Sequence, residues 1–216
     1  MRSTSRKNNT HVIRNTIFEY IKENLRSYLI LIIIFFIGLL LGVVFINNIN
    51  EVQSKQISEY ISNFINSVKE NYQISTNSLL ITSIINNLCI AILLWFLGST
   101  VIGVPLIYLV IGYKGYCIGY TIAAVTATLG TGKSIAFIFA TMLLQNIIYI
   151  PTIITLAVSG IKLYRLIMED RRKENIKVQI LKHTIFSVLM LILLLFSSVI
   201  ETYISGNLSQ IILKYC

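Results

Sequence analysis

Five long apolar stretches divide this chain, and polar or charged segments separate them. The stretches cover residues 28–47, 79–97, 101–128, 134–159 and 184–204. Each is about 20 residues or longer, the length that an α-helix needs to cross a hydrocarbon core of about 30 Å. The second and third stretches are nearly continuous, and the break between them falls either at 98–105 or near Lys114. The pattern predicts an all-α fold, a polytopic membrane bundle of about five transmembrane helices.

A different pattern occupies the polar segment between the first two spans. Apolar residues recur there at helical spacing, at Ile57, Tyr60, Ile61, Phe64, Ile65 and Val68. Such a stripe predicts one amphipathic helix over residues 51–72. The stripe either packs on its own protein or the lipid surface, which we favour, or binds a partner.

Composition supports a membrane protein. The chain has 216 residues, of which 55% are hydrophobic and 12% are charged, whereas a soluble domain is roughly a quarter charged. An ordinary water-soluble fold and a disordered chain are both excluded.

The net charge of +9 is concentrated in two places. Thirteen of the 18 Lys and Arg residues lie in residues 1–27 and 161–182. By the positive-inside rule both segments are cytoplasmic, and the four spans between them put them on the same side. The amphipathic helix and the tail, residues 206–216, then lie outside the cytoplasm. The basic charge therefore reports orientation and contact with lipid, and nucleic acid is not needed to explain it.

Residue types that support catalysis or metal binding are sparse. His11 and His183 are too few for a metal site, and neither has a serine motif to pair with. The segment Gly130-Thr-Gly-Lys-Ser134 is similar to the end of a phosphate-binding loop, but Ala127 stands where that motif needs glycine. We interpret the segment as a tight turn between two spans. We expect no enzymatic activity, no cofactor and no metal.

Polar residues inside the spans are more informative because each costs free energy there. A lysine at the bilayer centre costs about 2.5–3.5 kcal/mol on the insertion scale. The candidate residues are Asn86, Asn87, Lys114, Gln145, Asn146 and Glu201. They either bond between helices while Lys114 reaches toward the surface, or they form a polar pathway or a partner contact. Gly115 and Gly119 have the spacing that lets helix backbones approach closely, within one chain or in a homo-oligomer.

The same positions form an ordered set of motifs. They are Asn86-Asn87, Leu97-Gly98-x4-Gly103-x-Pro105, Lys114-Gly115-x3-Gly119, Leu144-Gln145-Asn146-x4-Pro151 and Glu201-Thr-Tyr203-Ile-Ser205. In this order, and with five spans, the chain resembles the stage II sporulation protein M family of endospore-forming bacteria. Related membrane families often have Asn-Gly at Lys114-Gly115 and His-Gly at Gln145-Asn146, and these departures favour the sporulation branch.

The resemblance implies a role in engulfment, when the mother-cell membrane migrates around the forespore. It implies a scaffold at the sporulation septum that localises sporulation proteins D and P, the peptidoglycan hydrolases of a remodelling complex. The alternative hypothesis is a transporter or permease-like membrane subunit, suggested by Lys114, Gln145 and Asn146.

Overall fold

The structure, a computed structural model, describes residues 18–69, 76–100, 102–169 and 176–205. These residues are almost entirely helical, without strands in the described ranges. The elements are α2 (Leu25–Asn47), α3 (Glu51–Lys69), α4 (Thr76–Gly98), α5 (Gly103–Leu129), α6 (Thr131–Ile138), the π-helix η1 (Phe139–Leu143), α7 (Leu144–Glu169), α8 (Ile176–Ile200) and the π-helix η2 (Glu201–Ser205). Five of the described helices, α2, α4, α5, α7 and α8, are long and apolar enough to span a membrane. The predicted all-α, five-span fold is confirmed.

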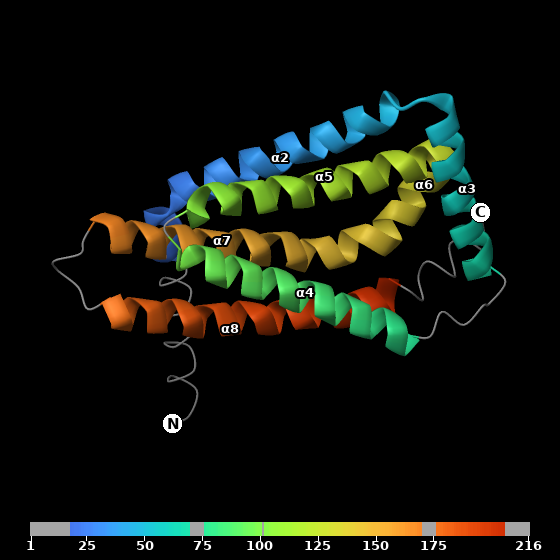
Figure 1. The fold of residues 1–216 in the computed structure, drawn as a ribbon. Coiled ribbons are helices and arrows are strands. Elements are labelled where there is room, and N and C mark those ends of the chain that lie inside the picture. The colour runs from blue at the N-terminus through green and yellow to red at the C-terminus, as the bar shows by residue number, and fades with distance from the viewer. Residues whose placement is uncertain (1–17, 70–75, 101, 170–175, 206–216) are drawn as a thin grey trace.

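Consecutive spans run in opposite directions, and α3 lies across one end of the bundle (Figure 1). We call this end the α3 end; it also carries the turn between α5 and α6 and the end of α8. We call the opposite end, where α7 ends and α8 begins, the hairpin end. Each described segment outside the spans therefore lies at one of these two ends of the bundle.

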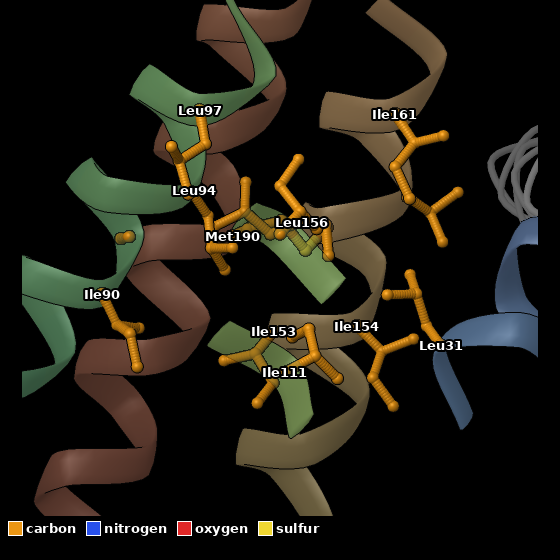
Figure 2. Packing of buried hydrophobic residues seen from close by; sticks show 14 of the residues in the cluster. Leu31, Ile90, Leu94, Leu97, Ile111, Ile153, Ile154, Leu156, Ile161 and Met190 are labelled. Atoms are coloured by element: carbon orange, nitrogen blue, oxygen red, sulfur yellow. The ribbon is translucent and has the colours of Figure 1, made fainter. Parts of the chain in front are cut away.

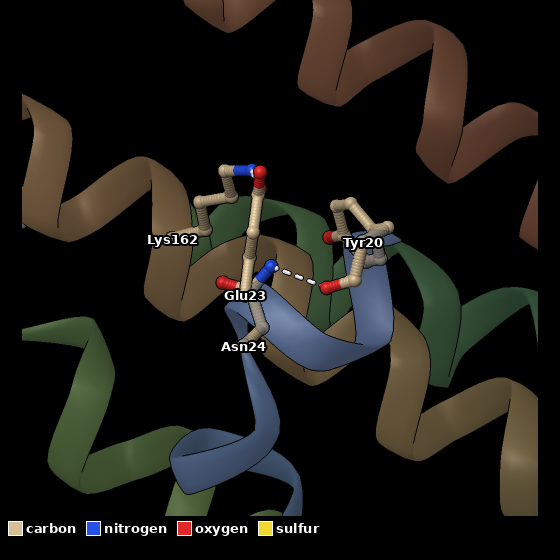
Figure 3. Close-up of polar contacts among 4 residues, drawn as sticks. All are labelled: Tyr20, Glu23, Asn24 and Lys162. Carbon is tan, nitrogen blue, oxygen red and sulfur yellow. Dashed lines mark hydrogen bonds and ion pairs between the residues drawn. The ribbon is translucent and has the colours of Figure 1, made fainter. Parts of the chain in front are cut away.

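The described residues that precede α2, 18–24, lie at the hairpin end. The Lys162 ammonium on α7 is 3.6 Å from the Glu23 carboxylate and 4.9 Å from the centroid of the Tyr20 ring (Figure 3). This contact brings the described parts of the two basic segments together, as four intervening spans require. The side of the membrane that this end faces stays a prediction.

The core is centred on α7, which is the most buried of the five spans. Ile153, Leu156 and Val158 on α7 have no exposed surface, and they pack against Leu94 of α4 and Ile111 of α5 (Figure 2). The outward faces of the other spans are also apolar, as shown by Phe36, Ile192 and many others that remain exposed. Lipid is as apolar as leucine, so close packing and hydrogen bonds between helices, more than hydrophobicity, hold such a bundle together.

Glycines bring α2 and α5 into close contact. A Cβ atom at Gly115 would overlap the Phe35 carbonyl group, and one at Gly119 would overlap the Leu39 carbonyl group. Gly38 on α2 meets the Gly112 backbone of α5 in the same way. The predicted close approach at Gly115 and Gly119 is therefore a contact within one chain.

The ends of the elements differ from the sequence pattern in three places. The break between the second and third spans lies at 99–102, so Lys114 is inside α5. The apolar run 134–159 is divided among α6, η1 and α7, and the spanning part is Gln145–Met168. The basic segment 161–182 is largely helical, because α7 continues to Glu169 and α8 starts at Ile176. Residues 1–17, 70–75, 170–175 and the predicted tail, 206–216, lie outside the described residues.

The turn between α5 and α6 is a single residue, Gly130, with a φ of +76°. L-residues rarely adopt this conformation, whereas glycine does so without steric cost. The predicted tight turn is confined to Gly130, because residues 131–134 form the first turn of α6, which is not one of the five spans.

Candidate functional site, a polar pocket within the bundle

A pocket of about 220 Å³ lies among α4, α5, η1, α7 and η2. All six polar residues that the sequence singled out within the spans line it: Asn86, Asn87, Lys114, Gln145, Asn146 and Glu201. The other lining residues are Ser83, Cys117, Ile118, Thr121, Met142 and Tyr149. Polar side chains that each cost free energy within a membrane thus line one common pocket.

Glu201 closes the pocket on one side. It is the first residue of η2, and the Ser83 hydroxyl of α4 donates a hydrogen bond to its carboxylate. A hydrogen bond to a charged acceptor is stronger than one between neutral groups. This link joins the end of the fifth span to the start of the second.

Asn87 connects α4 to α8 in the wall of the pocket. Its Nδ2 donates to the Leu194 carbonyl oxygen at 3.1 Å and to the Ser198 Oγ at 2.7 Å, and the side chain is buried. Asn86, the preceding residue, is exposed on the adjacent face of α4. Of the two neighbouring amides, Asn87 bonds between helices, as the structural interpretation expects.

Lys114 enters the pocket from the middle of α5. Its side chain is half-buried, and the ammonium lies 5.9 Å from the centroid of the Tyr149 ring on α7. That distance is at the outer edge of the range over which a cation is attracted to an aromatic face. Beside it, the Ser197 hydroxyl of α8 donates to the backbone carbonyl of Gln145 at 3.3 Å. Amine, carboxylate and amide groups therefore share one pocket between four spans.

The predicted glycine and proline positions lie outside the pocket and shape the helices. Gly103 begins α5, where a Cβ atom would overlap the Leu97 carbonyl group. Pro105 lies in the first turn of α5, where its missing N–H costs no hydrogen bond. Pro151 is inside α7 with its ring exposed, and it leaves one carbonyl of the helix without an intrahelical donor. Gly115 and Gly119 face α2, as described above.

The predicted stripe on α3 is divided between two surroundings. Ile65 is buried against Val125 of α5 and Phe137 of α6, and Ile61 packs on the same cluster. Tyr60 and Phe64 remain exposed, and Ile57 is half-buried. The side chain of Val68 lies outside the described part of the structure. Packing on the protein itself thus accounts for Ile61 and Ile65, and a partner contact remains open for Tyr60 and Phe64.

One polar contact joins residues that no sequence motif connects. The Ser159 Oγ of α7 lies 2.9 Å from the Nδ1 of His183 on α8, and both side chains are buried. Close by, the Trp95 indole N–H of α4 donates to the Thr184 Oγ1 at 3.1 Å. The sequence gives no signal for these pairs, because they depend on how α7 and α8 meet across residues 170–175. His11 lies outside the described residues.

The chemistry of the pocket is that of hydrogen bonds and charge. Among the described residues, no three His, Cys, Asp or Glu side chains gather closely enough to hold a metal ion. The groups present can hold a polar group of a partner helix or a small polar solute inside an otherwise apolar bundle.

Comparison with known proteins gives two matches. Residues 31–206 match the family described as stage II sporulation protein M. An uncharacterized protein of the archaeon Methanocaldococcus jannaschii is 25% identical over 186 residues, which make up 84% of this chain and 95% of the relative. No solved structure matches the chain.

Proposed function

The chain belongs to the stage II sporulation protein M family and is thus a sporulation-related, multi-pass membrane protein, and from this premise we propose that it is a non-enzymatic scaffold of the engulfment machinery. In this role it holds sporulation proteins D and P, the peptidoglycan hydrolases, at the outer face of the mother-cell membrane at the septum. The proposal joins the role implied by the family with one surface of this chain.

The observation that carries the proposal is the exposed aromatic pair on α3. The side chains of Tyr60 and Phe64 are 76% and 48% exposed, one helical turn apart. The next face of the same helix is fixed to the bundle through Ile61 and Ile65. Aromatic side chains dominate the binding energy of protein interfaces, and a helix that is already held in place loses little conformational freedom on binding.

The charge distribution supports an outward location for this surface, on the side where peptidoglycan lies. Basic residues are concentrated at the hairpin end, and the positive-inside rule assigns that end to the cytoplasm. The α3 end then faces outward, together with Tyr60 and Phe64. A scaffold for enzymes that act on the cell wall needs its docking surface on this side.

The test is co-purification of proteins D and P from sporulating cells with a Phe64→Asp variant. Loss of a central aromatic contact costs about 2 kcal/mol or more, so we expect roughly thirtyfold weaker recovery of the partners. Val52→Asp is the matched control, because Val52 is 68% exposed on a different face of α3. Equal recovery with Phe64→Asp and with the unchanged chain, at equal membrane levels, would refute the assigned role of α3.

The polar pocket favours a second candidate function, a transporter or permease-like subunit. Lys114 and Glu201 place an amine and a carboxylate in one cavity between spans, and ionisable groups within a membrane often mark solute or ion pathways. This function predicts that Lys114→Met abolishes a flux into vesicles that contain the protein. Normal sporulation and unchanged flux in that variant would exclude it.

A further inference from the structure

A second, larger cavity of about 380 Å³ lies at the hairpin end, between α7, α8 and the segment before α2. Each of the two helices contributes four positions with the spacing i, i+3, i+4 and i+7, so one face of each helix lines the cavity. Its volume falls in the range of small-molecule sites, about 300–1,000 Å³. This cavity is separate from the polar pocket, and they have no lining residue in common.

The cavity joins a basic side to an apolar side. Lys162 and Lys182 face it from the two helices, whereas Leu163, Leu166 and Phe186 supply apolar wall. Lys162 pairs with Glu23, but this pair is partly exposed to solvent, and an ammonium has three donors to share. Lys182 is exposed and has no ion-pair partner among the described residues. Among the described residues, the site therefore presents two ammonium groups and one carboxylate, Glu23, that pairs with one of them.

Neutral donors complete the polar side. The Tyr20 ring packs on Phe186 with centroids 5.7 Å apart, and its hydroxyl bonds with Ser159 (Figure 3 shows Tyr20 beside Lys162). Burial raises the pKa of Tyr20 to about 12, and the nearby Tyr28 adds to this effect. The hydroxyl is therefore a neutral donor at any physiological pH, and it adds no negative charge beside the lysines.

We expect the cavity to lie at the level where the hydrocarbon core ends. The α4–α5 turn closes at this height, because a Cβ atom at Gly98 would lie 2.6 Å from the Gly160 Cα of α7. Beyond this turn α7 and α8 continue beside the segment before α2, and with 26 and 25 residues they are about 39 and 38 Å long, which exceeds a core of about 30 Å. Lys162 and Lys182 lie on these extensions, and we expect their long side chains to bring the ammonium groups to the depth of the lipid headgroups.

We propose that this cavity binds the phosphate headgroup of an anionic glycerophospholipid. The two ammonium groups and the Tyr20 hydroxyl hold the phosphate, and the acyl chains lie along the apolar wall that continues into the bilayer. Basic cavities between spans on the cytoplasmic side recognise such headgroups in membrane proteins. A soluble phosphate shares the charge chemistry but gains nothing from Leu163, Leu166 and Phe186, so the apolar wall favours the lipid.

The test reconstitutes the full chain in nanodiscs that contain phosphatidylglycerol and phosphatidylcholine. After detergent release, native mass spectrometry measures which lipid stays bound. We expect the unchanged protein to retain phosphatidylglycerol. In the Lys162→Gln/Lys182→Gln variant, that preference should fall by at least about tenfold. Lys182→Gln alone, at an exposed side chain without an ion pair, should give a partial loss and guards against a folding defect in the double variant.

The matched control is Arg165→Gln/Lys177→Gln, which removes equal charge from exposed positions on the same two helices outside the cavity. Retained preference in this control supports a built site. An equal loss in both double variants, or no loss in the cavity variant, overturns the proposal. Inorganic phosphate is added in a separate arm, and displacement of the bound phosphatidylglycerol by phosphate would overturn the assignment to a lipid.

Discussion

Asn86 and Asn87 are adjacent on α4, yet their side chains have different surroundings. Asn87 is buried and donates to two acceptors on α8, whereas Asn86 is exposed on the rim of the polar pocket. In a membrane, a hydrogen bond between helices stabilises the fold by about 0.6 kcal/mol on average and up to about 1.7 kcal/mol. The two residues offer a test of what such an amide contributes.

We predict that Asn87→Leu lowers the free energy of unfolding by about 1–2 kcal/mol. The substitution keeps the branched skeleton of the side chain but removes the amide that donates to the Leu194 carbonyl and to Ser198. The free energy is measured by titrating the purified protein in mixed micelles with SDS. Asn86→Leu is the control and should leave stability within about 0.5 kcal/mol. Equal effects of the two substitutions would show that the bonds of Asn87 contribute nothing specific.

The cost of polar groups in a membrane predicted which residues line the pocket, but it did not predict the hydrogen bonds that they make. Asn86, Lys114, Glu201 and the other selected residues stood out because each is expensive in hydrocarbon, and they do gather in one cavity. Ser83, which bonds to Glu201, gave no such signal because serine is common and inexpensive within membrane helices. The contact between Ser159 and His183 could not be predicted for a second reason, because it depends on how α7 and α8 align along each other.

At the scale of elements, the contact between α2 and α5 depends on backbone meeting backbone. The atoms that a Cβ at Gly119 would meet are all backbone atoms of Leu39, so no side chain can rotate away to make room. The cost of such overpacking is typically about 1–3 kcal/mol. Because α2 leads into α3, a separation of α2 from α5 also moves the helix that carries Tyr60 and Phe64.

We predict that Gly119→Ala lowers the free energy of unfolding by about 1–3 kcal/mol, measured by the same titration. Gly132→Ala in α6 is the control, because a Cβ atom there meets nothing within 4 Å. In a helix, Ala is favoured over Gly by about 0.5–1 kcal/mol, so the control should be neutral or slightly stabilising. A Gly119→Ala protein as stable as the unchanged chain would mean that α2 and α5 can shift apart without cost.

Hydropathy predicted the existence and order of the five spans, because a run of about 20 apolar residues is typical of a transmembrane helix. It did not predict where the fourth span starts. The run 134–159 is apolar throughout, but the π-turn at Phe139–Leu143 separates α6, which packs under α3, from the spanning part of α7. Such a turn depends on tertiary packing, and hydropathy is insensitive to it.

At the scale of the whole molecule, the two ends of the bundle differ in charge and in the binding site that we propose for each. The hairpin end carries the proposed lipid cavity and most of the described basic residues, and the α3 end carries the exposed aromatic pair. The scaffold proposal depends on which end faces the cytoplasm, because proteins D and P act outside the membrane. The structure brings Lys162 and Glu23 together, which fixes the two basic segments at one end, and the positive-inside rule supplies the direction.

We predict that a cysteine in place of Thr131, exposed just after the α5–α6 turn, reacts with a membrane-impermeant maleimide in intact protoplasts. A cysteine in place of Lys177, at the start of α8, should react only after the cells are lysed. Both variants are made in a chain whose own cysteines, Cys89, Cys117 and Cys216, are replaced by alanine. The reverse pattern would place Tyr60 and Phe64 in the cytoplasm, away from peptidoglycan, and would end the scaffold proposal. The lipid cavity would then face the outer leaflet, where its two lysines could still bind an anionic headgroup, so the two proposals stand or fall separately.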